Sequence, residues 1–279
     1  MTKNNNLNKA KKAANDEFYT MYKDIENEMQ NYKDHFKGKV VYCNCDSEES
    51  NFFKYFKDNF KALELKQLIR SSLNDGVPFQ SDKGIELLKQ ADIVVTNPPF
   101  SLFRDFVGLL VKHDKKFIIV GSSNAITYKD VFKLIKENKL WLGINHLKQF
   151  MQPDGTTKKF GNICWFSNLE HKKRNEPLLL TKTYKGNETS YPKYDNYDAI
   201  EVSKTKDIPI DYNGVMGVPI SFLDKFCASQ FEIIGAAEDN GRGLSGDIMI
   251  DKKGNTHATL PNGKNMYSRI FIKNKNTNG

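Results

Sequence analysis

Hydrophobic and polar residues alternate along the first half of the chain in a way that predicts strands and helices in turn. Dense apolar runs typical of buried strands lie at residues 39–43, 91–96 and 116–121, and a weaker one lies at 61–69. Between them, apolar residues recur at helical spacing in the segments 24–29, 51–56, 84–90, 102–111 and 128–137. This alternation predicts an α/β fold with a largely parallel, doubly wound sheet.

The pattern changes after about residue 145, where helical periodicity thins out and Gly, Asn, Tyr and Pro become frequent. Three strand candidates follow at residues 162–166, 177–181 and 269–272, and one helix candidate at 221–226. We therefore predict a core domain over residues 1–145 and a second region over 146–279, which completes the core sheet and packs closely without a flexible linker. The polar first dozen residues are expected to be frayed.

The composition of the chain is compatible with a polyanionic binding partner. The 279 residues are 39% hydrophobic, enough for a sizeable core, and the net charge is +8 with a pI of about 9.0. Residues 145–279 carry 19 Lys or Arg and 15 Asp or Glu, so about half of the excess charge lies in each part. A diffuse basic surface suits nucleic acid without establishing it.

The cysteines predict no metal site and no disulfide. None of the four forms a Cys-x-x-Cys pair, and Cys43 and Cys45 are expected to face the same buried side of a strand as reduced thiols. No cysteine follows a proline, which argues against the Pro-Cys nucleophile of cytosine C5 methylation. The sequence has no signal peptide and no apolar run near 18 residues, so we expect a soluble, cytoplasmic protein without a membrane partner.

The segment Asn97-Pro98-Pro99-Phe100 carries most of the chemistry. It follows the strand candidate 91–96, and two prolines there allow neither further strand pairing nor an immediate helix. A stiff loop at the carboxyl end of a strand is where open α/β sheets bind ligands. The amide oxygen of Asn97 and the backbone carbonyl of Pro98 can both accept hydrogen bonds from one amino group, and Phe100 can cover the face of a base.

These residue types suit methylation of an amino group on a planar ring. The lone pair of adenine N6 is delocalised, and two acceptors on its hydrogens favour a more tetrahedral nitrogen. Positioning against the methyl group of S-adenosylmethionine supplies most of the effect, without a metal. A base in a duplex must be flipped out to reach such a loop. The alternative is a rigid Pro-Pro loop that follows a core strand.

Candidate cofactor residues are less distinctive. The loop after the first strand, Cys43-Asn44-Cys45-Asp46, lacks the usual glycines, although Asp46 could receive an ammonium group; otherwise Asp46 or Ser47 caps a helix. The segment 15–20 could close over a cofactor, or serve as a helix staple and cap. Asp82 could bond the adenine amino group of the cofactor, or be a surface acid.

Several segments resemble the EcoRI-type adenine-N6 DNA methyltransferases. The similar stretches are DEFYT at 16–20, FKGKVVYCNCD at 36–46, ADIVVTNPPFSLF at 91–103, KKFIIVGSSNAITY at 115–128, FGNICWF at 160–166 and GVPISFLDKF at 217–226. The resemblance covers most of the chain. It implies a Rossmann-like methyltransferase core, a C-terminal target-recognition region, S-adenosylmethionine as methyl donor and double-stranded DNA as substrate.

The resemblance also assigns residues. Phe18, Tyr19 and Thr20 match the N-terminal cofactor motif, Cys45 and Asp46 match the first-strand cofactor motif, and Asn97, Pro98 and Phe100 match the catalytic loop. Phe150 or Phe160 occupies the region that offers a second aromatic to the flipped base, and we favour Phe150.

The chain departs from the family pattern after the second strand. The acid expected there for the cofactor ribose is not evident near residues 68–71, and Val77-Pro78-Phe79 stands where the family has a Gly-Asp-Phe-like segment. The stretch between Arg70 and Phe79 is also shorter than expected. These departures leave open which residues contact the adenosine of the cofactor.

DNA contacts are expected in the C-terminal region. Arg242 lies between glycines, where it could reach a groove or a phosphate, and Lys172, Lys173 and Arg174 form either a phosphate-contact run or a solvated turn. We expect a monomer, either paired with a restriction endonuclease or solitary. The alternatives are a methyltransferase for ribosomal RNA or protein glutamine, and a non-catalytic DNA-binding relative.

Overall fold

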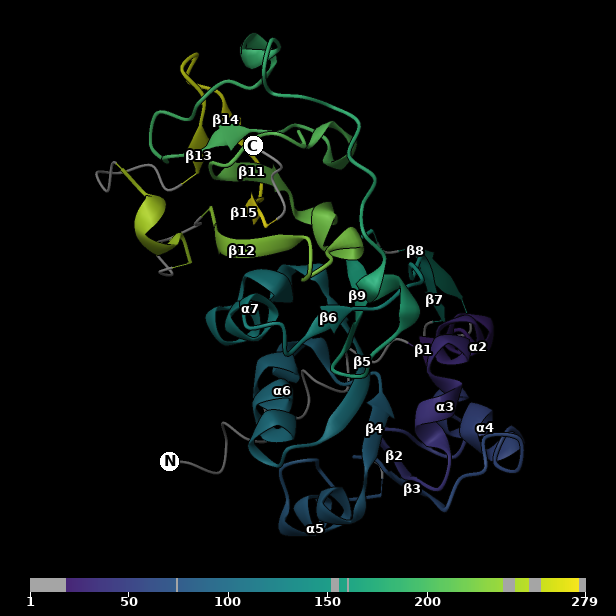
Figure 1. Ribbon diagram of the computed structural model, residues 1–279. Coiled ribbons are helices and arrows are strands. Elements are labelled where there is room, and N and C mark those ends of the chain that lie inside the picture. The colour runs from purple at the N-terminus through teal and green to yellow at the C-terminus, as the bar shows by residue number, and fades with distance from the viewer. Residues whose placement is uncertain are drawn as a thin grey trace, which may run out of the picture. The chain divides into compact units, whose positions relative to one another are not determined.

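The computed structural model describes residues 19–73, 75–151, 156–159, 161–237, 244–250 and 257–275 (Figure 1). The chain divides into two compact units. Unit 1 comprises the chain up to Val131 together with Leu140–His171, and unit 2 comprises Phe132–Lys139 and the chain from Lys172 onward. Helices and sheets of several strands occur together, so the predicted α/β class is confirmed. The first dozen residues, predicted to be frayed, lie outside the described residues.

The main sheet of unit 1 has the strand order β3-β2-β4-β5-β9-β6. Its strands are β2 (Val40–Asn44), β3 (Gln67–Ser71), β4 (Ile93–Thr96), β5 (Lys116–Ser122), β6 (Trp141–Leu142) and β9 (Ile163–Ser167). The first four strands of this order pair in parallel, whereas β9 is antiparallel to both β5 and β6. The strands expected at 39–43, 91–96 and 116–121 are therefore confirmed, whereas the segment 61–69 forms a strand only from Gln67, which continues to Ser71. The carboxyl ends of the four parallel strands meet at one edge.

Helices cover both faces of this sheet. The helices are α2 (Tyr22–Met29), α3 (Lys33–Phe36), α4 (Asn51–Asp58), α5 (Asp82–Gln90) and α6 (Phe103–Lys112), with short 3-10 turns at η1 (Gln30–Tyr32), η2 (Phe100–Leu102) and η3 (Ser123–Thr127). Helix α7 (Lys129–Lys136) begins in unit 1 and belongs to unit 2 from Phe132 onward. In Figure 1, α3 and α4 lie on one side of the sheet, and α5 and α6 on the other. Because side chains alternate along a strand, each strand contributes apolar groups to both layers.

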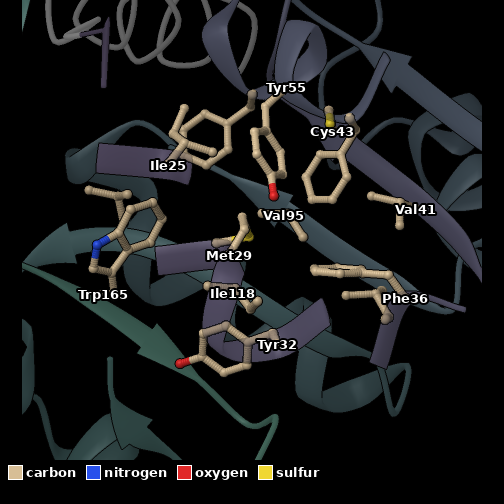
Figure 2. Packing of buried hydrophobic residues seen from close by; sticks show 14 of the residues in the cluster. Ile25, Met29, Tyr32, Phe36, Val41, Cys43, Tyr55, Val95, Ile118 and Trp165 are labelled. Carbon is tan, nitrogen blue, oxygen red and sulfur yellow. The ribbon is translucent and has the colours of Figure 1, made fainter. Parts of the chain in front are cut away.

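The larger core lies between the sheet and helices α2 to α4 (Figure 2). Val41, Val95 and Ile118 project into it from three neighbouring strands, and Phe36 packs edge-on against Phe56 with ring centroids 5.1 Å apart. On the opposite face, the rings of Phe103 and Phe166 lie 4.9 Å apart. Two packed layers hold the strands rigidly, so the loops at the strand ends have a fixed base.

A buried carboxylate also holds unit 1 together. Glu28 on α2 is fully buried and accepts hydrogen bonds from the backbone N–H groups of Ile144 (2.9 Å) and Asn145 (2.8 Å) and from the Tyr32 hydroxyl (3.1 Å). Burial raises the pKa of Glu28 above its ordinary value, while the hydrogen bonds from Ile144 and Asn145 lower it. Glu28 thereby anchors the loop that leads towards β7.

A second sheet in unit 1 pairs a strand near the start of the chain with two strands near residues 150–160. Strand β1 (Tyr19–Thr20) pairs antiparallel with β7 (Gln149–Met151), which pairs with β8 (Thr157–Lys159). Thr20 lies opposite Phe150 in this register. The pairing brings the predicted N-terminal cofactor motif beside the predicted base-stacking aromatic.

Unit 2 contains a four-stranded sheet in the order β10-β11-β15-β12. The strands are β10 (Ile200–Glu201), β11 (Met216–Pro219), β12 (Phe231–Ala236) and β15 (Arg269–Asn274), and a hairpin joins β13 (Ala258–Thr259) to β14 (Asn265–Met266). Its 3-10 turns are η4 (Lys172–Asn175), η5 (Glu188–Ser190), η6 (Thr205–Asp207), η7 (Ile220–Lys225) and η8 (Gly246–Ile248). The expected strand at 269–272 is confirmed, and the expected helix at 221–226 is a 3-10 turn.

The predicted strand at residues 177–181 is wrong. The Gln230 side chain takes the place of a partner strand there, because it accepts from Leu178 N (2.7 Å) and donates to Leu178 O (2.8 Å). Leu179 is 84% exposed. The apolar run is thus fixed by one amide group and does not form a ladder.

Candidate functional site

The candidate site of unit 1 lies where β2 and β4 end side by side. β2 ends at Asn44 and β4 at Thr96, and the two strands pair in parallel. The Thr96 hydroxyl lies in contact with the Asn44 carbonyl, so the two strand ends are close together. Both residues are buried, so the loops that follow them start from fixed positions.

Asp46 connects three elements at this edge. Its Oδ2 accepts from the Thr96 hydroxyl at 2.6 Å, and its Oδ1 accepts from the Ser50 hydroxyl at 2.6 Å. Its backbone N–H donates to Ser71 O at the end of β3 (2.9 Å). Asp46 is only 6% exposed, so these contacts are shielded from water.

The helix cap differs from the prediction. Ser50 is the N-cap of α4, because its hydroxyl accepts from Phe53 N (3.3 Å), and the proposed capping by Asp46 or Ser47 is wrong. The reason is that the Asp46 carboxylate is directed to the hydroxyl groups of Thr96 and Ser50.

Cys45 corrects a second expectation. Its φ of +72° ends the strand, so it does not share a buried face with Cys43 and is half-buried. Its thiol donates to the Asn44 side-chain oxygen at 3.3 Å. The Asn44 Nδ2 is buried and has no hydrogen-bond partner among the residues that the structure describes. A polar atom in that state is available for a ligand.

The loop Asn97-Pro98-Pro99-Phe100 leaves this edge directly. Asn97 and Phe100 are half-buried, and both prolines are buried. Pro99 is extended (φ −55°, ψ 126°), and its carbonyl accepts from Leu102 N at 2.9 Å, which starts the turn η2. Phe100 packs against the larger core. The loop is therefore stiff, as the two prolines predict.

The N-terminal motif lies beside the same edge. The Asn51 side chain donates to Thr20 O at 2.9 Å and joins β1 to the start of α4. Thr20 is buried and Tyr19 half-buried, while Phe18 lies outside the described residues. Phe150, opposite Thr20, is fully buried in the core. Its assignment to base stacking stays a prediction, and in this structure it packs with other apolar groups.

A cleft of about 580 Å³ opens at this edge of unit 1. Two stretches of chain, 47–54 and 70–75, line it together with two residues of the small sheet: Ser47, Glu48, Glu49, Asn51, Lys54, Arg70, Ser72, Asp75, Tyr19 and Met151. Carboxylates and hydroxyls dominate this lining. Of the residues predicted from the sequence, Tyr19 lies in it.

The three acids of this cleft, Glu48, Glu49 and Asp75, were not among the cofactor residues predicted from the sequence, and Asp75 is the one that follows β3. Its Oδ2 accepts from Arg70 (2.6 Å) and from the Ser72 hydroxyl (2.9 Å), and Arg70 also donates to Glu48 (3.1 Å). The hydrogen bond from Ser72 and the charge of Arg70 lower the pKa of Asp75 below its ordinary value. Asp75 lies four residues beyond the end of β3, where the strand pattern gives no signal for it.

The remaining predicted residues lie elsewhere. Asp82 is the exposed first residue of α5, which Ser81 caps by accepting from Gly84 N at 3.1 Å. Lys172, Lys173 and Arg174 form η4 of unit 2, with Lys172 exposed and the other two half-buried. Arg242 lies outside the described residues. The roles of these residues stay predictions.

The described residues form neither a metal-ion cluster nor a membrane-spanning helix. Among residues 19–275, apart from the undescribed gaps, no three His, Cys, Asp or Glu side chains are grouped so that they could hold a metal ion. None of the helices within the described segments is long and apolar enough to cross a membrane.

Comparison with known proteins gives consistent matches along the chain. The profile of a family described as "Adenine-specific methyltransferase EcoRI" matches residues 6–78 and 70–275. The Type II methyltransferase M.EcoRI of Escherichia coli is 46% identical over 329 aligned positions, which cover 96% of each chain. M.MgeORF184P of Mycoplasma genitalium and M.MpnI of Mycoplasma pneumoniae, both described as Type II methyltransferases, are 40% and 42% identical, over 96% of this chain and 98% of each relative.

Proposed function

Because the chain belongs to the EcoRI family of adenine-specific methyltransferases, we propose that it transfers a methyl group from S-adenosylmethionine to adenine N6 in double-stranded DNA. The observation that carries the proposal is the position of Asn97-Pro98-Pro99-Phe100 at the end of β4, one strand away from Asp46 and beside the cleft-lining loop after β2. The sheet around β2 and β4 then serves as a Rossmann-like core, and unit 2 as the target-recognition region.

The cofactor pocket of this proposal is the cleft of unit 1. S-adenosylmethionine brings a methyl group on a positively charged sulfur, an ammonium group and ribose hydroxyls. The carboxylates of Glu48, Glu49 and Asp75 suit these positive charges and hydroxyls, and Tyr19 offers an aromatic face. The buried Asn44 Nδ2, which has no partner within the described part of the chain, can donate to an anionic or carbonyl oxygen. We assign to Asp75 the role of the acid that sequence comparison did not find after the second strand.

Asn97 and Pro98 perform the positioning step. The Asn97 amide oxygen and the Pro98 carbonyl accept hydrogen bonds from the two hydrogens of the amino group, and direct its lone pair towards the methyl carbon. The new N–C bond forms as the S–C bond breaks, and the amino nitrogen then loses one proton to solvent. Phe100 stacks on the flipped base. No charged base is required, because positioning lowers the barrier.

Cofactor and DNA contacts complete the proposal. Phe18, Tyr19, Thr20, Cys45, Asp46 and Asp82 remain candidate cofactor residues, and Lys172, Lys173, Arg174 and Arg242 candidate DNA contacts. Asp46 acts in part through Thr96 and Ser50, because its carboxylate accepts hydrogen bonds from both hydroxyl groups. We propose a monomer that either protects DNA beside a restriction endonuclease or acts alone.

Methyl transfer to unmethylated genomic DNA tests the function. Labelled S-adenosylmethionine is the donor, nucleoside analysis identifies the product, and sequencing locates the modified positions. N6-methyladenine in one short sequence is the expected result. Label in ribosomal RNA or protein in place of DNA would redirect the assignment, and failure to bind the cofactor in calorimetry would leave a non-catalytic DNA-binding protein.

A further inference from the structure

The hairpin β13–β14 of unit 2 presents an exposed tip on an ordered base. Ala258 lies opposite Met266 and Thr259 opposite Asn265, and Leu260 N donates to Lys264 O at 2.9 Å. Gly263 takes the left-handed conformation (φ +76°) that closes the turn. Residues 261–265 are exposed, whereas Ala258 belongs to the buried cluster of unit 2.

Buried polar groups hold the base of this hairpin in place. Asn196, 6% exposed, accepts from Thr259 N (3.0 Å) and donates to His257 O (2.6 Å). After the hairpin, Arg269 donates to both oxygens of Glu201 (2.9 and 2.8 Å) and to the Tyr267 carbonyl (2.8 Å). The Arg269 and Glu201 side chains are 9% and 2% exposed. The buried bidentate ion pair of Arg269 with Glu201 therefore fixes the backbone carbonyl of Tyr267.

The Tyr267 side chain is nevertheless 75% exposed. Ser268 next to it has a φ of +32°, a left-handed conformation that is costly for a residue other than glycine. Single exposed apolar residues are common on protein surfaces. An exposed aromatic residue is uncommon where its own carbonyl is fixed by a buried ion pair and its neighbour has a strained backbone. Such backbone strain is concentrated at binding sites. This combination presents a rigid aromatic ring to solvent.

The exposed tip of the hairpin carries a cation, Lys264, which suits an anionic partner. Residues 257–279 contain Lys264, Arg269, Lys273 and Lys275 and no Asp or Glu. Glu201 neutralises Arg269, and Glu232 lies opposite Lys273 in the pairing of β12 with β15. Lys275 donates to Ala228 O at 2.7 Å, so Lys264 is the cation that belongs to the hairpin itself. Lys264 lies at the exposed hairpin tip, three residues before Tyr267. A cation and an aromatic side chain exposed on one short segment can together contact a phosphate and a sugar or base edge of a duplex.

We infer that the hairpin Ala258–Met266, together with Tyr267, is a DNA-contacting element of unit 2. Lys264 contacts a phosphate, and Tyr267 contacts a base or sugar in a groove. This inference rests on the proposed function, since it takes double-stranded DNA as the partner. It adds residues to those predicted from the sequence, none of which lies in this hairpin.

Binding of a labelled duplex that contains the methylated sequence tests the element. Tyr267→Ala is expected to raise the Kd at least about fivefold, as the loss of an interface side chain that contributes more than about 1 kcal/mol does, and Tyr267→Phe to keep it within about twofold. Lys264→Ala should reduce the slope of log Kd against log salt by about one. Leu179→Ala, which removes an 84% exposed apolar side chain elsewhere in unit 2, is the matched control and should change neither quantity.

The outcomes separate the two proposals. Wild-type affinity and salt slope in both Tyr267→Ala and Lys264→Ala would overturn the DNA-contact assignment while DNA methylation by the wild type stands. If the wild type methylates only RNA or protein, the proposed function fails, and with it the choice of DNA as partner. Thermal unfolding of each variant checks the fold, and an effect of Leu179→Ala equal to that of Tyr267→Ala would also refute a specific contact.

Discussion

The Thr96 hydroxyl donates a hydrogen bond of 2.6 Å to the Oδ2 of Asp46, and so joins the residue before Asn97 to the loop after β2. Thr96 is fully buried, and the same carboxylate accepts from Ser50 at 2.6 Å. One side chain thus connects the end of β4 with the N-terminus of α4. In the proposed reaction, this bond sets the position of Asn97 relative to the cofactor.

We expect Thr96→Val to lower kcat more than it raises the KM for S-adenosylmethionine. Valine has nearly the same shape but no donor, so the bond to Asp46 is lost and the buried carboxylate loses one of its partners. Such a loss also costs about 1–3 kcal/mol of the free energy of unfolding. Thr96→Ser keeps the hydroxyl and should restore kcat. Steady-state kinetics and urea unfolding of both variants provide the measurement.

Ser167→Ala is the matched control for this prediction. Ser167 is a buried residue of β9, and its hydroxyl donates to Phe117 O at 3.0 Å. Phe117 is the second residue of β5, so this bond lies at the amino end of that strand. Its loss should lower stability without changing kcat. If Thr96→Val behaves in the same way as Ser167→Ala, the bond to Asp46 is structural only.

Asn97→Ala should abolish methyl transfer and leave cofactor binding nearly intact. The alanine removes one of the two acceptors for the amino group, and the loss of one such positioned polar group lowers kcat by about 10²–10³-fold in other enzymes. Single-turnover transfer and calorimetric titration with S-adenosylmethionine measure the two effects separately. Asn124→Ala, at an exposed position after β5, is the control. Equal loss of binding and transfer contradicts the assigned role.

Much of unit 1 is predictable because its signals are local. The runs at 91–96 and 116–121 are dense enough in β-branched residues to specify buried strands, and Pro98-Pro99 specifies the stiff loop that follows. The strand predicted at 177–181 fails for the opposite reason. Its apolar residues look like a strand, but Gln230, 52 residues further along the chain, pairs with the Leu178 backbone.

The site is less predictable because its contacts join distant segments. Nothing near Thr20 indicates that Phe150 lies opposite it, and the pattern around Asp46 cannot distinguish a helix cap from an acceptor for Thr96. Asp75 is hidden in a loop, where only its bonds to Arg70 and Ser72 direct it to the cleft. Side-chain pairing across the fold decides all three positions.

Comparison of Asp75→Ala with Asp82→Ala separates the acid that the structure places in the cleft from the one predicted from the sequence. We expect Asp75→Ala to raise the Kd for S-adenosylmethionine about 10- to 100-fold, because the alanine removes the carboxylate that would accept hydrogen bonds from the ribose hydroxyls of the cofactor. Asp82 is exposed at the start of α5, so Asp82→Ala should change the Kd by less than about twofold. Calorimetry decides between them, and the reverse order would support Asp82.

Glu28 makes stability depend on pH. Burial raises its pKa above the ordinary 4.5, so the folded protein binds this proton more readily than the unfolded chain does. The associated stabilisation is complete below pH 4.5 and is lost as the pH rises through the raised pKa. Glu28→Gln does not titrate. The free energy of unfolding of the wild type should therefore fall relative to that of Glu28→Gln as the pH rises from about 4 to 8; parallel curves would exclude this effect.

Phe100 and Phe150 should separate into a base-contact residue and a core residue. Phe100 is half-buried next to Asn97, so Phe100→Ala should weaken the complex with target DNA by about 1–3 kcal/mol, the cost of one lost base–aromatic stack. Because Phe100 packs only partly against the core, its loss should lower stability less than the loss of Phe150 does. Phe150 is fully buried, and Phe150→Ala should cost about 3–5 kcal/mol of unfolding free energy. Duplexes with a mispaired target adenine flip more easily, so the defect of Phe100→Ala should shrink on them. If Phe150→Leu, which keeps the core filled, loses DNA affinity as Phe100→Ala does, then Phe150 also contacts the flipped base and must leave the core to do so.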